Sequence, residues 1–221
     1  MDFAGAYSAD NLRFLMEGLK MTLYVAFWAI ILSFIIGCVI GVIRYMQVPV
    51  LSQVLAVIVE VLRNLPLLLI IFFVQFAIPQ ISFFGLQFKF TIPAGAIIAL
   101  TLFEAAMISE IVRAGLKSIP KGQVEAARAS GLGSVQTLWH IVLPQGLRRM
   151  VPPLVSQFIS LLKDTSLAVI VALAELMHNA QIIIGQSPNY SIPILLLVAM
   201  IYFAVNYTLS LISRRLETRT A

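Results

Sequence analysis

The sequence has few charged residues and a single cysteine, Cys38. Charged residues make up 11% of its 221 positions, whereas a soluble domain has about a quarter. One cysteine can form neither an intrachain disulfide nor a cysteine cluster for a metal, and we predict no metal site, no cofactor and no catalytic residue. Hydrophobic residues make up 60% of the chain, and the mean hydropathy is +0.98. These values exclude a water-soluble enzyme, a nucleic-acid-binding domain and a disordered chain, so the surface must face membrane lipid.

Long apolar runs without alternating polarity predict an all-α membrane protein, because a backbone in lipid must satisfy its own hydrogen bonds. A helix needs about 20 apolar residues to cross the hydrocarbon layer. The sequence predicts five transmembrane helices, at 21–43, 54–78, 93–114, 152–173 and 192–212. The domain organisation is then an external segment at 1–20, a transmembrane domain at 21–213 that includes a cytoplasmic loop at 115–150, and a cytoplasmic tail at 214–221.

The distribution of Lys and Arg predicts the orientation of these spans. With the N-terminus outside, the inner segments hold ten of these residues and the outer segments hold three, while Arg63 and Lys163 lie at membrane depth. Positive charge favours the cytoplasmic side. We therefore expect the N-terminus outside and the C-terminus in the cytoplasm. The net charge of +5 follows from this topology and does not indicate a nucleic-acid partner.

The predicted loop at 115–150 has the pattern of two short helices. Pro120 suits the first turn of a helix, and Gly131 suits the left-handed residue that ends one. Ser134 is a candidate N-cap for the second helix, and Pro144 is expected to stop or bend it. The second helix carries an apolar stripe, which consists of Val135, Leu138, Trp139, Val142 and Leu143. The pair could dock on another protein or rest on lipid headgroups, and periodicity alone does not decide between them.

A family resemblance bears on this loop. Glu125-Ala126-Ala127, followed by Gly131, Ile141 and Leu143-Pro144 at fixed spacing, resembles the EAA loop of ABC-transporter permease subunits. Four other segments resemble the polar amino-acid permeases of bacterial importers: 18–23, 63–68, 109–115 and 162–167. At 63–66 that family more often has Arg-Gly-Thr-Pro, where this chain has Arg-Asn-Leu-Pro.

The resemblance implies a type I ABC importer permease in the bacterial cytoplasmic (inner) membrane. It also implies partners: two cytoplasmic ATPase subunits, an external or periplasmic solute-binding protein, and a second permease subunit in a homo- or heterodimer. By this resemblance the loop is a coupling helix, and its matching residues are Glu125, Ala126, Ala127 and Gly131. The substrate implied is a polar amino acid, such as glutamine or glutamate. ATP would be hydrolysed on a separate subunit, in keeping with the absence of a phosphate-binding loop from this sequence.

Ionisable groups at membrane depth are costly, so each is a functional candidate. Two cations and two acids with hydrogen-bonding neighbours would suit a zwitterionic amino acid. The candidate substrate-binding residues are Arg63, Asn64, Glu104, Lys163, Asp164, Thr165 and Ser166. The alternative is a set of structural ion pairs, such as Glu60–Arg63 and Glu110–Arg113, at helical spacing.

Two other functions compete with the importer subunit. One is an ion-coupled amino-acid carrier or channel that works without an ATPase, although such carriers often show internal repeats, and none is found here. The other is a structural membrane anchor, which would not need charges at membrane depth. Gly37 and Gly41 form a G-x-x-x-G pair, which predicts a face for close helix packing.

Overall fold

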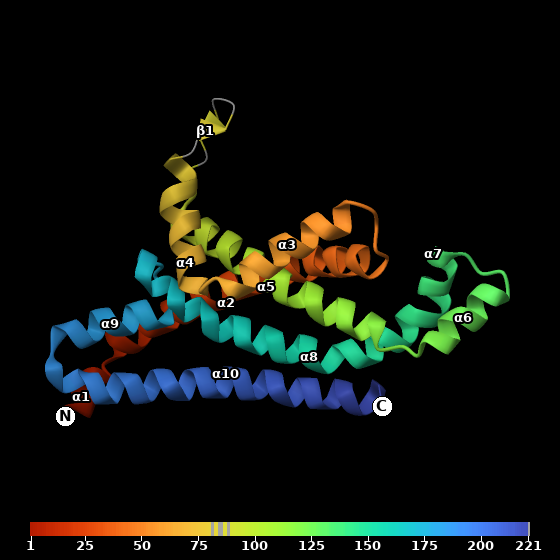
Figure 1. Ribbon diagram of the computed structural model, residues 1–221. Helices are drawn as coiled ribbons and strands as arrows, with labels where there is room; N and C mark the ends of the chain where they lie inside the picture. The colour runs from red at the N-terminus through yellow and green to blue at the C-terminus, as the bar shows by residue number, and fades with distance from the viewer. Residues whose placement is uncertain (81, 84–85, 88, 221) are drawn as a thin grey trace. The chain divides into compact units, whose positions relative to one another are not determined.

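The computed structural model describes residues 1–80, 82–83, 86–87 and 89–220, and it is helical apart from two short strands (Figure 1). The final residue of the predicted tail, Ala221, lies outside the described residues. The elements in chain order are α1 Phe3–Ala6, α2 Ala9–Tyr45, α3 Leu51–Asn64, α4 Leu67–Phe72, η1 Phe73–Ala77, η2 Ile78–Gln80, β1 Ser82–Phe83, β2 Leu86–Gln87, α5 Ile92–Lys117, α6 Lys121–Ala129, α7 Ser134–Thr137, η3 Leu138–Val142, α8 Leu143–Asp164, η4 Thr165–Val171, α9 Leu176–Gln186, η5 Pro188–Tyr190 and α10 Ser191–Thr220. Strands β1 and β2 pair antiparallel.

Four of the described helical segments are long and apolar enough to cross a membrane: Ala9–Tyr45, Ile92–Lys117, Ser134–Val171 and Pro188–Leu211. A fifth candidate is the broken pair Leu51–Asn64 and Leu67–Ala77. The break occurs at Pro66, which has no N–H for a helical bond and disfavours the helical conformation of the residue before it. Pro66 itself is extended, with ψ 131°. A proline inside a helix removes a backbone hydrogen bond and bends the helix, so the sequence predicts a kink at Pro66 in the span 54–78, and the structure confirms it.

The chain divides into two compact units. The first comprises Met1–Ile31, Leu65–Thr101 and Ile159–Leu209. Its core gathers buried residues of α1, α2, α9 and α10, which are Ala6, Leu15, Leu176, Ala180, Ile183, Ile194 and Val198. Helix α2 begins at Ala9 and runs without interruption to Tyr45, so most of the predicted external segment at 1–20 is continuous with the first span.

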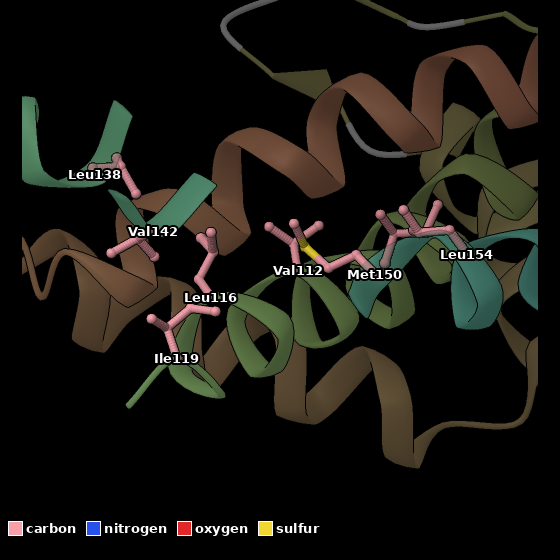
Figure 2. Close-up of a cluster of buried hydrophobic side chains, with 8 residues drawn as sticks. Val112, Leu116, Ile119, Leu138, Val142, Met150 and Leu154 are labelled. Atoms are coloured by element: carbon pink, nitrogen blue, oxygen red, sulfur yellow. The ribbon is translucent and has the colours of Figure 1, made fainter. Parts of the chain in front are cut away.

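The second unit comprises Leu32–Asn64, Leu102–Phe158 and Ser210–Ala221. Its core joins α5, η3 and α8 through Ile108, Val112, Leu116, Ile119, Leu138, Val142, Met150 and Leu154. Figure 2 shows Leu138 and Val142 of η3 near Leu116 and Ile119, with Met150 and Leu154 of α8 on the other side of Val112. The loop helices are thus fixed by apolar packing to the end of α5.

Gly37 and Gly41 allow α2 to lie directly against α5. A Cβ atom at Gly37 would come within 2.7 Å of Ile108, and one at Gly41 within 2.7 Å of Val112. Such distances are shorter than any packed side chain tolerates. The close helix contact predicted from the G-x-x-x-G spacing is confirmed.

One expectation for the loop was wrong, and of the two alternatives expected at Pro144 the structure excludes one. Gly133, and not Ser134, is the N-cap of α7, and its N–H donates to Oε1 of Gln136 at 2.8 Å. Pro144 does not stop the helix, because α8 begins at Leu143 and continues through it. The π-helical segment Leu138–Val142 comes directly before Pro144. Widening the helical turn in this way accommodates a residue that lacks an N–H donor.

Candidate functional site

Glu110 on α5 is the centre of an ion-pair cluster in the second unit. Its Oε2 atom lies 2.8 Å from Nη1 of Arg44, and its Oε1 accepts from the guanidinium of Arg113, including a 3.1 Å bond from Nε. Nη1 of Arg63 lies farther away, at 4.0 Å from Oε2. The predicted Glu110–Arg113 pair is therefore present. The Glu60–Arg63 pair is not among the ion pairs of the described residues, because Arg63 approaches Glu110 instead.

Arg63 and Asn64 end α3 and border a polar cavity of about 340 Å³. The cavity is lined by Arg44, Val59, Glu60, Arg63, Asn64, Met107 and Glu110. The amide nitrogen of Asn64 donates to the carbonyl oxygen of Glu60 at 2.7 Å, one helical turn earlier. Arg63 and Asn64 form the last turn of α3, because the helix ends before Pro66. The carbonyl groups of that turn have no partner within the helix.

Glu104 on α5 is fully buried in the same unit. Its Oε2 accepts a hydrogen bond from Nε2 of Gln157 on α8, at 2.8 Å. Gln157 was not identified from the sequence, although it precedes Asp164 by two helical turns. A buried carboxyl held by an amide from a second helix is a polar link between α5 and α8.

The remaining candidates, Lys163, Asp164, Thr165 and Ser166, belong to the first unit, where α8 gives way to η4. Thr165 Oγ1 donates to the carbonyl of Leu162 and Ser166 Oγ to that of Lys163, both at 2.7 Å. These hydroxyl groups therefore satisfy carbonyls that the end of the α-helix leaves free. Lys163 is exposed, Asp164 and Ser166 are half-buried, and Thr165 is fully buried.

Glu175, a buried acidic residue that is not among the candidates predicted from the sequence, lies nearby along the chain. Its carboxylate caps α9, accepting from the backbone N–H of Met177 at 2.9 Å and of His178 at 2.7 Å. Tyr202 of α10 donates its hydroxyl to the same carboxylate at 3.3 Å. Burial raises the pKa of the Glu175 carboxyl, and these donors lower it in part. The position was recognisable as a lone acid within the apolar stretch 167–177.

Helix α2 approaches this cap closely, which explains part of the 18–23 motif. The N–H of Leu176 donates to Oγ1 of Thr22 at 3.1 Å. A Cβ at Gly18 would lie 2.9 Å from the carbonyl oxygen of Glu175. Contact with the start of α9 therefore accounts for the glycine at position 18 and the threonine at position 22.

The predicted coupling residues lie on α6 and at its end. Glu125 and Ala126 are exposed, and Ala127 is buried. Gly131 has φ +89°, a left-handed value that suits glycine, and the N–H of the next residue bonds back to the carbonyl of Ala127 at 3.1 Å. This pattern ends α6 and turns the chain toward α7.

The five residues of the apolar stripe differ in burial, and the last of them, Leu143, begins α8 and is half-buried. Leu138 and Val142 are buried in the core of the second unit, 7% and 1% exposed. Val135 and Trp139 are 56% and 61% exposed. The segment therefore anchors itself with two of its five stripe residues and presents two others outward. Within the described part of the chain, no three His, Cys, Asp or Glu side chains come together as metal ligands.

Comparison with known proteins gives one consistent result. Residues 29–221 match the family model described as "Binding-protein-dependent transport system inner membrane component". A Bacillus subtilis protein named "Probable glutamine ABC transporter permease protein GlnP" is 65% identical over 221 residues, covering 99% of both chains. The glutamine transport system permease GlnP of Escherichia coli K12 is 36% identical, covering 93% of this chain and 92% of its own.

Solved structures agree with the sequence relatives. The crystal structure of an amino acid ABC transporter with histidines has a TM-score of 0.87 and 27% sequence identity, covering 99% of both chains. The inward-facing MetNI methionine ABC transporter has a TM-score of 0.78 at 23% identity, covering 97% of this chain and 99% of its own. The second likeness supports the fold alone.

Proposed function

The chain belongs to the family of binding-protein-dependent transport system inner membrane components, and from this premise we propose that it is the permease subunit of an ATP-driven importer of polar amino acids. Its fold is the expected all-α permease fold of type I ABC importers. The 65% identity to a GlnP protein over nearly the whole chain supports glutamine as the first substrate to test. The carrier that works without an ATPase becomes the less favoured alternative.

The observation that carries the proposal is the division of the stripe on α7 and η3. Trp139 and Val135 are open to a partner, while Leu138 and Val142 of the same segment pack against α5. A push on the exposed residues therefore reaches a helix long enough to cross the membrane. Tryptophan is among the residues that dominate binding energy at protein interfaces.

In this proposal the helix pair α6–α7 docks on a separate ATPase subunit. Glu125 and Ala126 are exposed on α6, and the small alanine side chain lets a partner approach the backbone. Gly131 fixes the turn that holds α6 and α7 together. Two ATPase subunits, two permease subunits and an external binding protein would make up the working assembly, with the N-terminus of each permease outside the cell.

The translocation pathway is proposed to use Arg63, Asn64, Glu104, Lys163, Asp164, Thr165 and Ser166. Opposite charges along a pathway suit a solute that carries a carboxylate and an ammonium group. Conformational switching between inward- and outward-open states would carry the solute past these groups. ATP hydrolysis supplies the energy on the partner subunit, and this chain supplies the path.

A double comparison tests both halves of the proposal. Trp139→Ala should remove most ATPase binding and lower ATP-dependent glutamine uptake in proteoliposomes at least tenfold. His140→Ala changes an exposed neighbour and should leave ATPase binding and uptake near wild type.

Asp164→Ala tests the pathway, and it should abolish uptake and leave the ATPase subunits bound. Uptake driven by an ion gradient without ATP would contradict the proposal, as would full coupling by the Trp139→Ala protein.

A further inference from the structure

The cavity at the end of α3 has the charges of both ends of a free amino acid. Of the seven residues that line it, Arg44 and Arg63 are cations and Glu60 and Glu110 are anions. Its volume of about 340 Å³ falls within the range of about 300–1,000 Å³ typical of small-molecule sites. Charged groups in a helical membrane protein commonly mark a solute path.

The two guanidinium groups of this cavity are held to Glu110 with different strength. Arg44 contacts Glu110 at 2.8 Å with a side chain 12% exposed, and it also bonds Oγ of Ser109 at 3.4 Å. Arg63 contacts the same carboxylate at 4.0 Å with a side chain 41% exposed. Hydrogen-bonded charge pairs are the strong ones, so Arg63 is the guanidinium that a competing carboxylate displaces most easily.

Glu60 is the complementary group. It precedes Arg63 by one helical turn and lines the same cavity, yet it takes part in no ion pair within the described ranges. The neighbouring Asn64 commits its amide nitrogen to the backbone carbonyl of Glu60. Its amide oxygen remains as an acceptor, so the end of α3 offers one cation beside two acceptors.

We propose that this cavity is a binding station for the zwitterionic backbone of an amino acid, with the α-carboxylate on Arg63 and the α-ammonium on Glu60. Glu110 is then an internal carboxylate that keeps Arg63 occupied while no solute is bound. Arg44 and Arg113 retain Glu110 when Arg63 turns to the solute, so no anion is left uncompensated. The station rests on the proposed function, and it adds Glu60 and Glu110 to the residues that select the substrate class.

Equilibrium binding to the purified permease–ATPase complex, without binding protein or ATP, tests the station. The probes are L-glutamine, its α-amide, which lacks the carboxylate, and 4-carbamoylbutanoate, which lacks the ammonium group. Arg63→Gln should weaken L-glutamine binding about tenfold and change binding of the α-amide less than twofold. Glu60→Gln should weaken L-glutamine binding similarly and spare 4-carbamoylbutanoate.

Three further variants sharpen the test. Glu110→Gln should tighten L-glutamine binding by about twofold at most, because the internal competitor is gone and the Arg63–Glu110 contact is weak. Arg63→Lys keeps the charge and should fall between wild type and Arg63→Gln. Arg13→Gln removes an exposed cation of α2 that does not line the cavity, and it should bind all three probes as wild type does.

The outcomes separate this inference from the proposed function. If Arg63→Gln weakened all probes equally, or none, the station would be wrong even with ATP-dependent uptake intact. A wild-type complex that imports glutamine but binds none at millimolar concentration in this assay would overturn it too. If the wild-type complex imported no polar amino acid with ATP, the proposed function would fail, whereas probe-selective effects of Arg63→Gln and Glu60→Gln would still support the station.

Discussion

Two acidic residues of this chain, Glu110 and Glu175, lie among apolar helices and are stabilised in different ways. Glu110 is surrounded by the side chains of Arg44, Arg63 and Arg113, and it remains 22% exposed. Glu175 is fully buried and bonds two backbone N–H groups and one tyrosine hydroxyl. The first acid depends on charged side chains, whereas the second depends mainly on backbone donors.

The difference separates a cluster that can rearrange from one that cannot. Long arginine side chains can exchange partners at little cost when they are partly solvated. Backbone donors at a helix start can turn away only if the helix itself unwinds. We therefore expect the Glu175 cap to act as a structural anchor and the Glu110 cluster to take part in solute passage.

The largest effect is expected from Glu175→Ala. Losing the carboxylate leaves buried N–H groups of α9 without an acceptor, at a cost of about 2–4 kcal/mol in the free energy of unfolding. The expected result is a clearly lower melting temperature of the detergent-solubilised protein. Glu175→Gln keeps an acceptor oxygen and should lose about half as much. If both variants melted as wild type does, Glu175 would not be an anchor.

A smaller effect is expected from Arg44→Gln. This change removes the 2.8 Å contact to Glu110 from a side chain that is 12% exposed. Because Arg113 stays in place, the loss of stability should be about 1–2 kcal/mol. Thermal melts at low and high salt measure it, and the gap between variant and wild type should narrow as salt screens the remaining charges. If the difference in melting temperature did not change with salt, the lost stability would come from lost packing and not from the lost ion pair.

The smallest effect on stability is expected from Arg63→Gln. At 4.0 Å and 41% exposure, the Arg63–Glu110 pair should contribute less than about 0.5 kcal/mol. The melting temperature should stay within error of wild type, while the binding of L-glutamine changes as described above. A loss of stability as large as that of Arg44→Gln would remove the distinction between the tight and the loose arginine.

The sequence was sufficient for features that arise from local chemistry. Apolar runs predicted the membrane helices, Pro66 predicted the break after α3, and Gly131 predicted the end of α6. These features depend on a few adjacent residues and on general limits of the backbone. The family motif around Glu125 added the functional expectation to the loop.

Features that depend on contacts between distant segments were not predictable in the same way. From the sequence alone Arg44 indicates only topology, because nothing local shows that it meets Glu110, 66 positions away. The contacts of Glu175 and Thr22 are unpredictable for the same reason, since they join α2, α9 and α10. The continuation of α8 through Pro144 depends on a π-helical turn that no residue pattern specified.

The glycine contact between α2 and α5 has a mechanical consequence. With no side chain at Gly37 or Gly41 to act as a spacer, Ile108 and Val112 lie almost on the α2 backbone. Sliding one helix along the other would drive larger neighbouring side chains into that narrow gap. Over this stretch the two helices form one rigid unit. Bending during a transport cycle must therefore take place at hinges elsewhere in the chain.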